Sequence, residues 1–169
     1  MSRLGNRPLR AVRLFLALPL DRKRLWMEAF VELGKARLQL LRPFAKVAPT
    51  LGAAMRETTK ERVEAKERAE VMAVADAIQV MSRHTPWSSM CFTRAVAALR
   101  MLARRGIGCT LYLGTARDEA GKLTAHAWLR SGDVYVTGAE EKKRFATVGK
   151  FAHASRRNNE GGHPREDAQ

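Results

Sequence analysis

The hydrophobic pattern of the chain changes its period once, near Gly106, and this change limits the fold more than any other feature. From Cys91 to Leu102 apolar residues recur at helical spacing, which predicts an α-helix with one buried face. The "ARRG" that follows gives a basic last turn with Gly106 as the helix end. Apolar and polar residues then alternate in "CTLYLGTAR", "TAHAWLR" and "VYVTG", separated by turn sequences. We therefore expect an α+β fold, in which helices precede an antiparallel three-stranded meander.

Two further helices are expected upstream. Asp21 can cap a first helix, which must end before Pro43. Its apolar positions at near-helical spacing are Trp26, Phe30, Leu33, Leu40 and Leu41. Residues 44–55 contain proline and glycine and predict a connector or a broken helix. Residues 56–82 predict a second helix, charged in its first half, with a buried stripe of Met72, Ala75, Ile78 and Met81.

These patterns divide the chain into three parts. Residues 1–55 form a basic helical region, and residues 56–154 hold the core with the long helix and the sheet. Within the core, the segment from Lys142 predicts a short helix or an irregular cover. Residues 155–169 have Ala168 as their only apolar residue, which predicts a disordered tail.

The charge of the chain calls for an acidic partner. Its 169 residues carry a formal net charge of +14, which suits nucleic acid, an anionic membrane surface or an acidic peptide or protein. No helix-turn-helix signature or series of stacking aromatics supports nucleic acid. The apolar run near the N-terminus is too short to span a bilayer and is a poor signal peptide, so peripheral contact with lipid stays open. Two cysteines are too few for a disulfide framework, and we expect a cytoplasmic protein.

Cys91 and His126 are the candidate reactive pair. Cys91 lies at the start of the predicted helix, where the positive end of the backbone dipole stabilises a thiolate. It is either a nucleophile or a small hydrophobe at a boundary. His126 is the one histidine in a strongly apolar strand, and histidine is the usual base for a thiol near neutral pH. A lone strand histidine can equally be a hydrogen-bonded bystander.

Other chemistry finds less support in the sequence. Cys109 opens an apolar strand with no base nearby and is expected to be a small buried residue. Trp87 and Trp128 either wall a substrate cleft beside the thiol or belong to the core. A phosphate-binding glycine loop, a CxxC pair and an HExxH helix are all missing, so we expect no metal and no cofactor.

Two sequence blocks carry a resemblance to a known family. The blocks are "W-x3-C-F-x-R-A-x-A-A-L-x-x-L-A-R-R-G-I" and "L-Y-L-G" followed by "A-H-A-W". Together they resemble the transglutaminase-like cysteine proteases that act as leader peptidases in lasso-peptide biosynthesis, the protease part of the B protein. The N-terminal "FLALPLDRKRLWMEAFVELGKARLQLL" is similar to the helical lead-in of the stand-alone form. The similarity covers about residues 10–151.

The resemblance implies papain-like chemistry. Cys91 would be the nucleophile and His126 the base, which later protonates the leaving amine. The amide N–H of Cys91 and a donor from residues 87–90 would bind the oxyanion. The resemblance also implies a bacterial pathway that matures a ribosomally made precursor peptide. The implied partners are this precursor, a separate winged-helix leader-recognition protein and an ATP-dependent lasso macrolactam synthetase.

The third catalytic residue is where the sequence departs from the family. The family expects an aspartate on the strand after the histidine. Counting the hairpin through Ser131 and Gly132 pairs Arg130 with Asp133 and leaves Asp133 about 13 Å along the strand from the partner of His126. We therefore expect Glu140 to orient the imidazole. The alternatives are Thr137, Glu141, the more distant Asp133, a backbone carbonyl, or no orienting residue at all.

Two other functions remain open at this point. Without the aspartate, the chain can be a non-catalytic scaffold or binding module that keeps the fold. The same cysteine and histidine can also transfer an acyl group to an amine instead of water, as transglutaminases do.

Overall fold

The computed structural model describes residues 19–140 and 142–155. Its helices are α2 (Leu20–Gln39), α3 (Phe44–Val47), α4 (Ala65–Ser82) and α5 (Cys91–Arg104), with short 3-10 helices at Ala48–Leu51 and Lys142–Arg144. Its strands are β1 (Ala53–Ala54), β2 (Cys109–Arg117), β3 (Leu123–Ser131), β4 (Val134–Thr137) and β5 (Ala146–His153). All neighbours in the sheet are antiparallel, in the order β1-β5-β2-β3-β4. The α+β prediction is confirmed, with five strands where three were expected.

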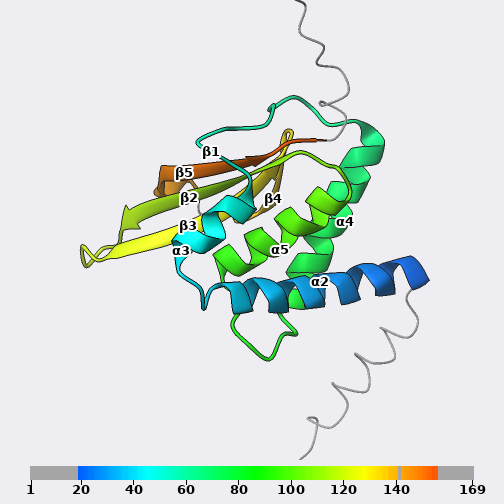
Figure 1. Ribbon diagram of the computed structural model, residues 1–169, viewed down its shortest axis with the longest axis horizontal. Coiled ribbons are helices and arrows are strands. Elements are labelled where there is room, and N and C mark those ends of the chain that lie inside the picture. The colour runs from blue at the N-terminus through cyan, green and yellow to red at the C-terminus, as the bar shows by residue number, and fades with distance from the viewer. Residues whose placement is uncertain (1–18, 141, 156–169) are drawn as a thin grey trace, which may run out of the picture.

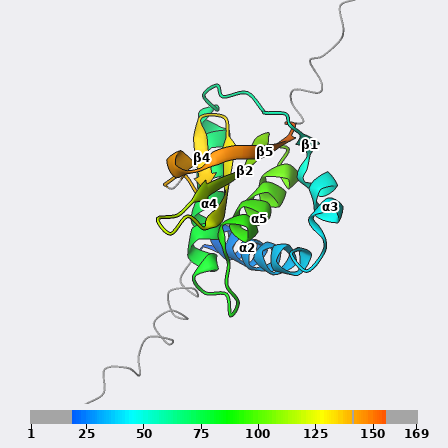
Figure 2. The ribbon, with the colours of Figure 1, turned by 90° about the vertical axis from the view of Figure 1, so that its left-hand side faces the viewer.

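The helices form two layers beside the sheet (Figures 1 and 2). Helix α5 packs against β2, β3 and β4, and α4 packs against β4 and α5. Helix α2 lies across α4 and α5. One apolar core joins the layers, with Leu33 from α2, Val74 from α4, Leu102 from α5 and Leu129 from β3. This core runs across the boundary expected near residue 55.

Helix α5 follows the prediction. The most deeply buried positions of α2 and α4 differ from those expected. Helix α5 is the most amphipathic of the long helices, and Gly106 follows it with a φ of +70°. Asp21 lies inside the first turn of α2 and makes no capping bond, because Pro19 precedes the helix. Helix α4 begins at Ala65 and buries Val71, Val74, Ala77 and Ile78. Of the expected stripe, Ile78 is buried, Ala75 and Met81 are half-buried and pack against the core, and only Met72 is exposed.

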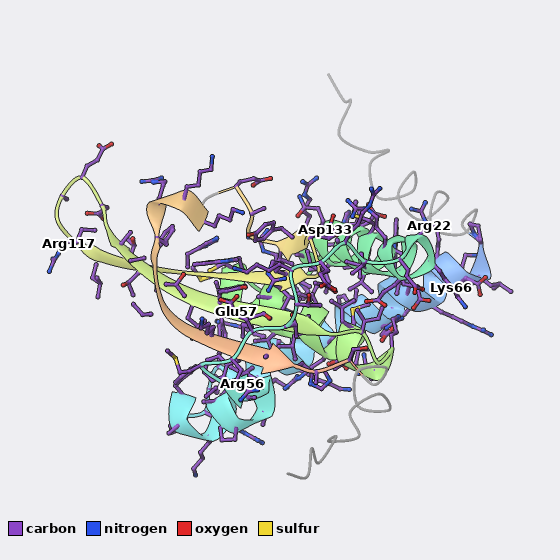
Figure 3. All side chains as sticks on the ribbon, turned by 90° about the horizontal axis from the view of Figure 1, so that it is seen from above. Arg22, Arg56, Glu57, Lys66, Arg117 and Asp133 are labelled. Carbon is purple, nitrogen blue, oxygen red and sulfur yellow. The ribbon has the colours of Figure 1, made fainter. Side chains whose placement is uncertain are left out.

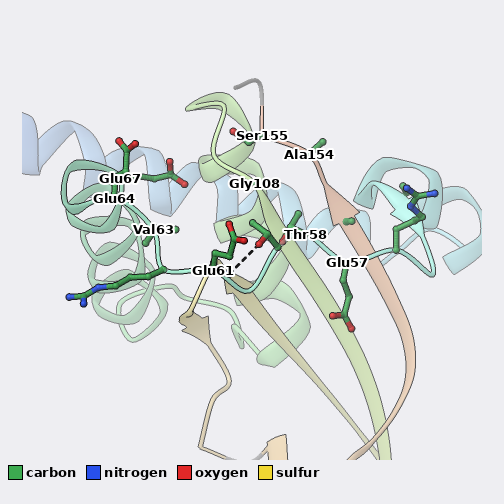
Figure 4. A pocket seen from close by; sticks show the side chains of 15 residues that line it. Glu57, Thr58, Glu61, Val63, Glu64, Glu67, Gly108, Ala154 and Ser155 are labelled. Atoms are coloured by element: carbon green, nitrogen blue, oxygen red, sulfur yellow. Dashed lines mark hydrogen bonds between the residues drawn. The ribbon is translucent and has the colours of Figure 1, made fainter. Parts of the chain in front are cut away.

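Residues 56–64 are extended rather than helical because they cross to α4 along the sheet. The guanidinium of Arg130, 2% exposed, donates hydrogen bonds to the carbonyl oxygens of Thr58, Thr59 and Gly132. The hydroxyl of Thr110 on β2 accepts a further bond from the Thr58 amide. Figure 4 shows this connector from Glu57 to Glu64. A helix from residue 56 would remove these main-chain acceptors.

The prediction for the segment from Lys142, a short helix or an irregular cover, was right only for its first residues. Only Lys142–Arg144 is helical, and Ala146–His153 is β5, which lies between β1 and β2 in the sheet. Phe151 is the one buried residue of β5, so the strand shows little alternation. Its pairing with β2, about forty residues earlier along the chain, is long-range and has no local signal.

The register of the last hairpin also differs from the prediction. Ser131 pairs with Val134 across a turn at Gly132 and Asp133, and Arg130 pairs with Tyr135. A bulge between Leu129 and Arg130 then shifts the strands by one residue, so Leu129 pairs with Thr137. A bulge adds a residue to one strand and reorients the side chains beyond it.

Among the helices of the described residues, none combines the length and the apolar character needed to cross a membrane.

Candidate active site

Cys91, His126 and Glu140 line one cavity of about 570 Å³. The residues around it come from α4, from the N-terminal end of α5, from β3 and from β4 with the chain just after it. Segments far apart in the sequence thus meet here, and the three residues expected to be catalytic are brought together at one cavity.

Cys91 is the first residue of α5. Met90 precedes it in an extended conformation, and no side chain caps the helix. The first turn contains no acidic residue, so nothing there offsets the positive end of the helix dipole. The half-buried thiol therefore combines access to the cavity with a position that stabilises negative charge.

Cys109 has the opposite surroundings. It is fully buried in the core at the start of β2. Burial raises the pKa of its thiol to about 12, because a thiolate there would lose its hydration. Its predicted role as a small buried residue agrees with this position.

His126 is held by a main-chain carbonyl and by aromatic rings. It is 8% exposed, and its Nε2 lies 3.1 Å from the carbonyl oxygen of Gly138. Since a carbonyl only accepts, Nε2 carries the proton and donates it, and Nδ1 is the basic nitrogen in the neutral ring. The imidazole stacks on Trp128, with 5.9 Å between ring centroids, and contacts Phe145 at 5.0 Å.

Gly138 is a site residue that the sequence analysis missed. Its φ is +69°, and a Cβ there would lie 2.7 Å from the carbonyl oxygen of Ala127 and 3.0 Å from Nε2 of His126. Only glycine fits both the backbone conformation and this space. The available signal was a glycine at the end of the "VYVTG" segment, which was interpreted as the last residue of the third strand.

The acidic candidates lie in different places. Asp133 is in the β3–β4 turn, outside the cavity lining, and its carboxylate accepts hydrogen bonds from Arg68. These bonds lower the pKa of Asp133 below its ordinary value. Glu140 is exposed and lines the cavity. The group that accepts the hydrogen bond from Nε2 of His126 is the carbonyl of Gly138. Glu141 lies outside the described residues. Among the described residues, the Gly138 carbonyl thus lies at hydrogen-bond distance from Nε2, and the identity of the orienting group stays a prediction.

Neither tryptophan is among the residues that line this cavity. Trp87 packs against α2, with its ring centroid 5.3 Å from that of Phe30. Trp128 stacks between Tyr112 and His126 and is 5% exposed. Trp128 therefore supports the imidazole from behind, and direct contact of either ring with substrate stays a prediction.

A second cavity has a different character. It measures about 620 Å³ and lies under the connector of residues 56–64 (Figure 4). Its lining contains neither a cysteine nor a histidine. Four glutamates contribute to it: Glu57, Glu61, Glu64 and Glu67. It lacks both a thiol and an imidazole, so the cavity at Cys91 is the better candidate for thiol chemistry. Among the described residues, no cluster of three His, Cys, Asp or Glu side chains could hold a metal ion.

Comparison with known proteins gives one match. A family model described as "Transglutaminase-like superfamily" matches residues 36–150. This range begins inside α2, ends inside β5 and contains Cys91, His126 and Glu140. Searches of curated proteins and of solved structures found no match.

Proposed function

The chain belongs to the transglutaminase-like superfamily, and on this premise we propose that it is a cysteine peptidase in which Cys91 is the nucleophile and His126 the base. The observation that carries the proposal is that both residues line one cavity although they come from α5 and β3. Thiol proteases need these two groups beside an accessible space for the substrate.

The proposed reaction has two stages. Nδ1 of His126 takes the proton of the Cys91 thiol, and the sulfur attacks a peptide carbonyl carbon. The amide N–H of Cys91 and a donor from residues 87–90 bind the oxyanion. The imidazolium then gives its proton to the leaving amine, and a thioester remains on Cys91. Water, deprotonated by His126, hydrolyses the thioester and restores the thiol.

The proposed substrate is the leader segment of a lasso-peptide precursor. This proposal rests on the resemblance of the Cys91 and His126 blocks to leader peptidases of that pathway. A winged-helix recognition protein would present the leader, and a macrolactam synthetase would use the freed amino terminus. The net charge of +14 suits an acidic leader or an acidic partner surface.

Cleavage of a precursor tests the peptidase proposal. Purified protein, mixed with its leader-recognition protein and precursor, should release leader and core peptides that mass spectrometry identifies. Cys91→Ala should abolish this cleavage because no other thiol lies at the cavity, whereas Cys109→Ala should retain it if the variant folds. Cleavage by Cys91→Ala at the wild-type rate would contradict the assignment.

Amine acyl transfer is a second candidate, favoured by the superfamily itself. It shares the thioester stage, and only the acceptor differs. Adding a primary amine during the reaction separates the two, since an acyltransferase gives an amide whose mass exceeds that of the hydrolysis product by the amine less one water. A non-catalytic scaffold would show neither product, and its Cys91 would react with iodoacetamide no faster than a free thiol at the same pH.

A further inference from the structure

We propose that Arg94 makes the Cys91 cavity a binding site for a carboxylate of the substrate, next to the carbonyl that is attacked. The proposal deepens the proposed function and rests on it for the reactivity of Cys91. The carboxylate belongs either to an Asp or Glu side chain or to a chain terminus, which have the same chemistry.

Arg94 is placed to contact a group that is bound at the Cys91 thiol. It lies three residues after Cys91 on α5, and residues with this spacing share one face of a helix. Both residues line the cavity. A substrate that offers a carbonyl to the sulfur therefore has its neighbouring groups within the range of a long arginine side chain.

Arg94 has no acidic partner in the part of the chain that the structure describes. Its Nε is buried and makes no hydrogen bond, and a buried guanidinium nitrogen without a partner is rare. Every other described arginine that is buried or half-buried has a carboxylate within 4.0 Å. The pairs are Arg68–Asp133, Arg100–Glu32, Arg105–Glu28 and Arg130–Glu57.

The acidic residues that line the cavity do not pair with Arg94. The carboxylate of Asp76 pairs with Arg22 of α2 at 3.1 Å, and Glu140 is exposed and forms no ion pair with Arg94. Across the cavity, the hydroxyl of Thr137 is also buried and without a partner. A substrate carboxylate would satisfy both groups, because it accepts hydrogen bonds from a guanidinium and from a hydroxyl.

Two alkylating reagents of nearly equal size test the proposal. The sulfur of Cys91 displaces iodide from iodoacetate or iodoacetamide and forms the same S–C bond, but only iodoacetate carries a carboxylate. The readout is the ratio of the two rate constants at Cys91, measured by mass spectrometry of its peptide. Arg94→Gln should lower the iodoacetate-to-iodoacetamide ratio about tenfold, the size expected for one charge-assisted hydrogen bond.

A matched control removes the same charge elsewhere. Arg83 is exposed, follows α4 and does not line the cavity, so Arg83→Gln should leave the ratio unchanged. Equal ratios in wild type and Arg94→Gln, with rapid iodoacetamide reaction in both, would overturn the carboxylate site and leave the peptidase proposal intact. Slow reaction with both reagents in wild type would instead count against the activated thiol. A melting curve shows whether each variant is folded.

A second measurement does not need a reactive thiol. Phenylglyoxal modifies arginine, and peptide mapping reports the rate at Arg94. Acetyl-Ala-Asp-Ala-amide should slow this modification if the site takes an acidic side chain, and acetyl-Ala-Ala-Ala with a free carboxyl terminus should slow it if the site takes a terminus. Acetyl-Ala-Asn-Ala-amide should protect in neither case. Equal protection by all three peptides, or by none, would overturn the proposal.

Discussion

Gly138 shows how a single main-chain position can set the state of a side chain. Its carbonyl accepts the Nε2 proton of His126, and its positive φ turns the chain across the imidazole. The carbonyl fixes which nitrogen of the imidazole carries the proton.

Gly138→Ala should impair the site as well as the stability. The new methyl would collide with the Ala127 carbonyl and with Nε2 of His126, so the imidazole must move. The matched control is Gly121→Ala, because Gly121 also has a positive φ, +76°, but has open space around it. Both variants should lose about 1 kcal/mol from backbone strain.

The difference between these two variants is the informative quantity. Gly138→Ala alone should lose more stability than the backbone strain accounts for, because its methyl also collides with neighbouring atoms. It should also change the pH dependence of the reaction of Cys91 with iodoacetamide, since the imidazole is displaced. Differential melting and the alkylation profile measure the two effects. Identical profiles in both variants would show that the imidazole does not act on the thiol.

At the scale of elements, the sequence predicted the features that depend on near neighbours. Helix α5, strands β2 to β4 and the turn glycines follow from hydrophobic period and turn residues, and these elements place Cys91 and His126 at the cavity. The features it missed depend on distant contacts. Strand β5 is defined by its pairing with β2, and residues 56–64 stay extended because Arg130 binds their carbonyls.

The same distinction explains the site residues. A helix-start cysteine and a strand histidine have local signals, so both could be proposed from the sequence. The orienting group could not be assigned, because the bulge at Leu129 and Arg130 shifts the register of β4. Arg94 has no distinguishing local signal in the sequence, and only its missing partner in three dimensions marks it as unusual.

Arg130 should be essential for the connector. Arg130→Met leaves the carbonyls of Thr58, Thr59 and Gly132 without their donor, which should cost at least about 3 kcal/mol of unfolding free energy. The loosened connector should also be cut by trypsin at Arg56, Lys60 or Arg62. Chemical denaturation and timed proteolysis measure these effects.

The control for Arg130 lies at the opposite end of the sheet. Arg117, at the tip of the β2–β3 hairpin (Figure 3), donates one exposed hydrogen bond to the Gly121 carbonyl. Arg117→Met should change stability by no more than about 0.5 kcal/mol. Comparable losses in both variants, or a connector that trypsin spares in Arg130→Met, would contradict the role given to Arg130.

On the scale of the molecule, α2 belongs to the core. It buries Ala29, Leu33 and Ala36 against α4 and α5. Glu32 of α2, 2% exposed, accepts a hydrogen bond from Arg104 of α5. Burial opposes its ionisation, but the hydrogen bonds from Lys35 and Arg104 lower its pKa overall. Separating α2 from the rest would expose apolar surface and leave these charges unpaired.

Residues 56–155 alone should therefore not fold cooperatively, whereas residues 19–155 should. Circular dichroism with thermal melting distinguishes the two chains: a sigmoidal transition is expected only for the longer one. A cooperative transition in the shorter chain, with a melting temperature close to that of the longer one, would restore a domain boundary near residue 55.

The β2–β3 hairpin reaches away from the helices, and Figure 3 shows Arg117 at the end opposite Arg22 and Asp133. No atom approaches a side chain built on Gly121. This tip is consequently a practical handle: a fluorophore or an immobilisation tag attached there would lie apart from the residues that line the Cys91 cavity.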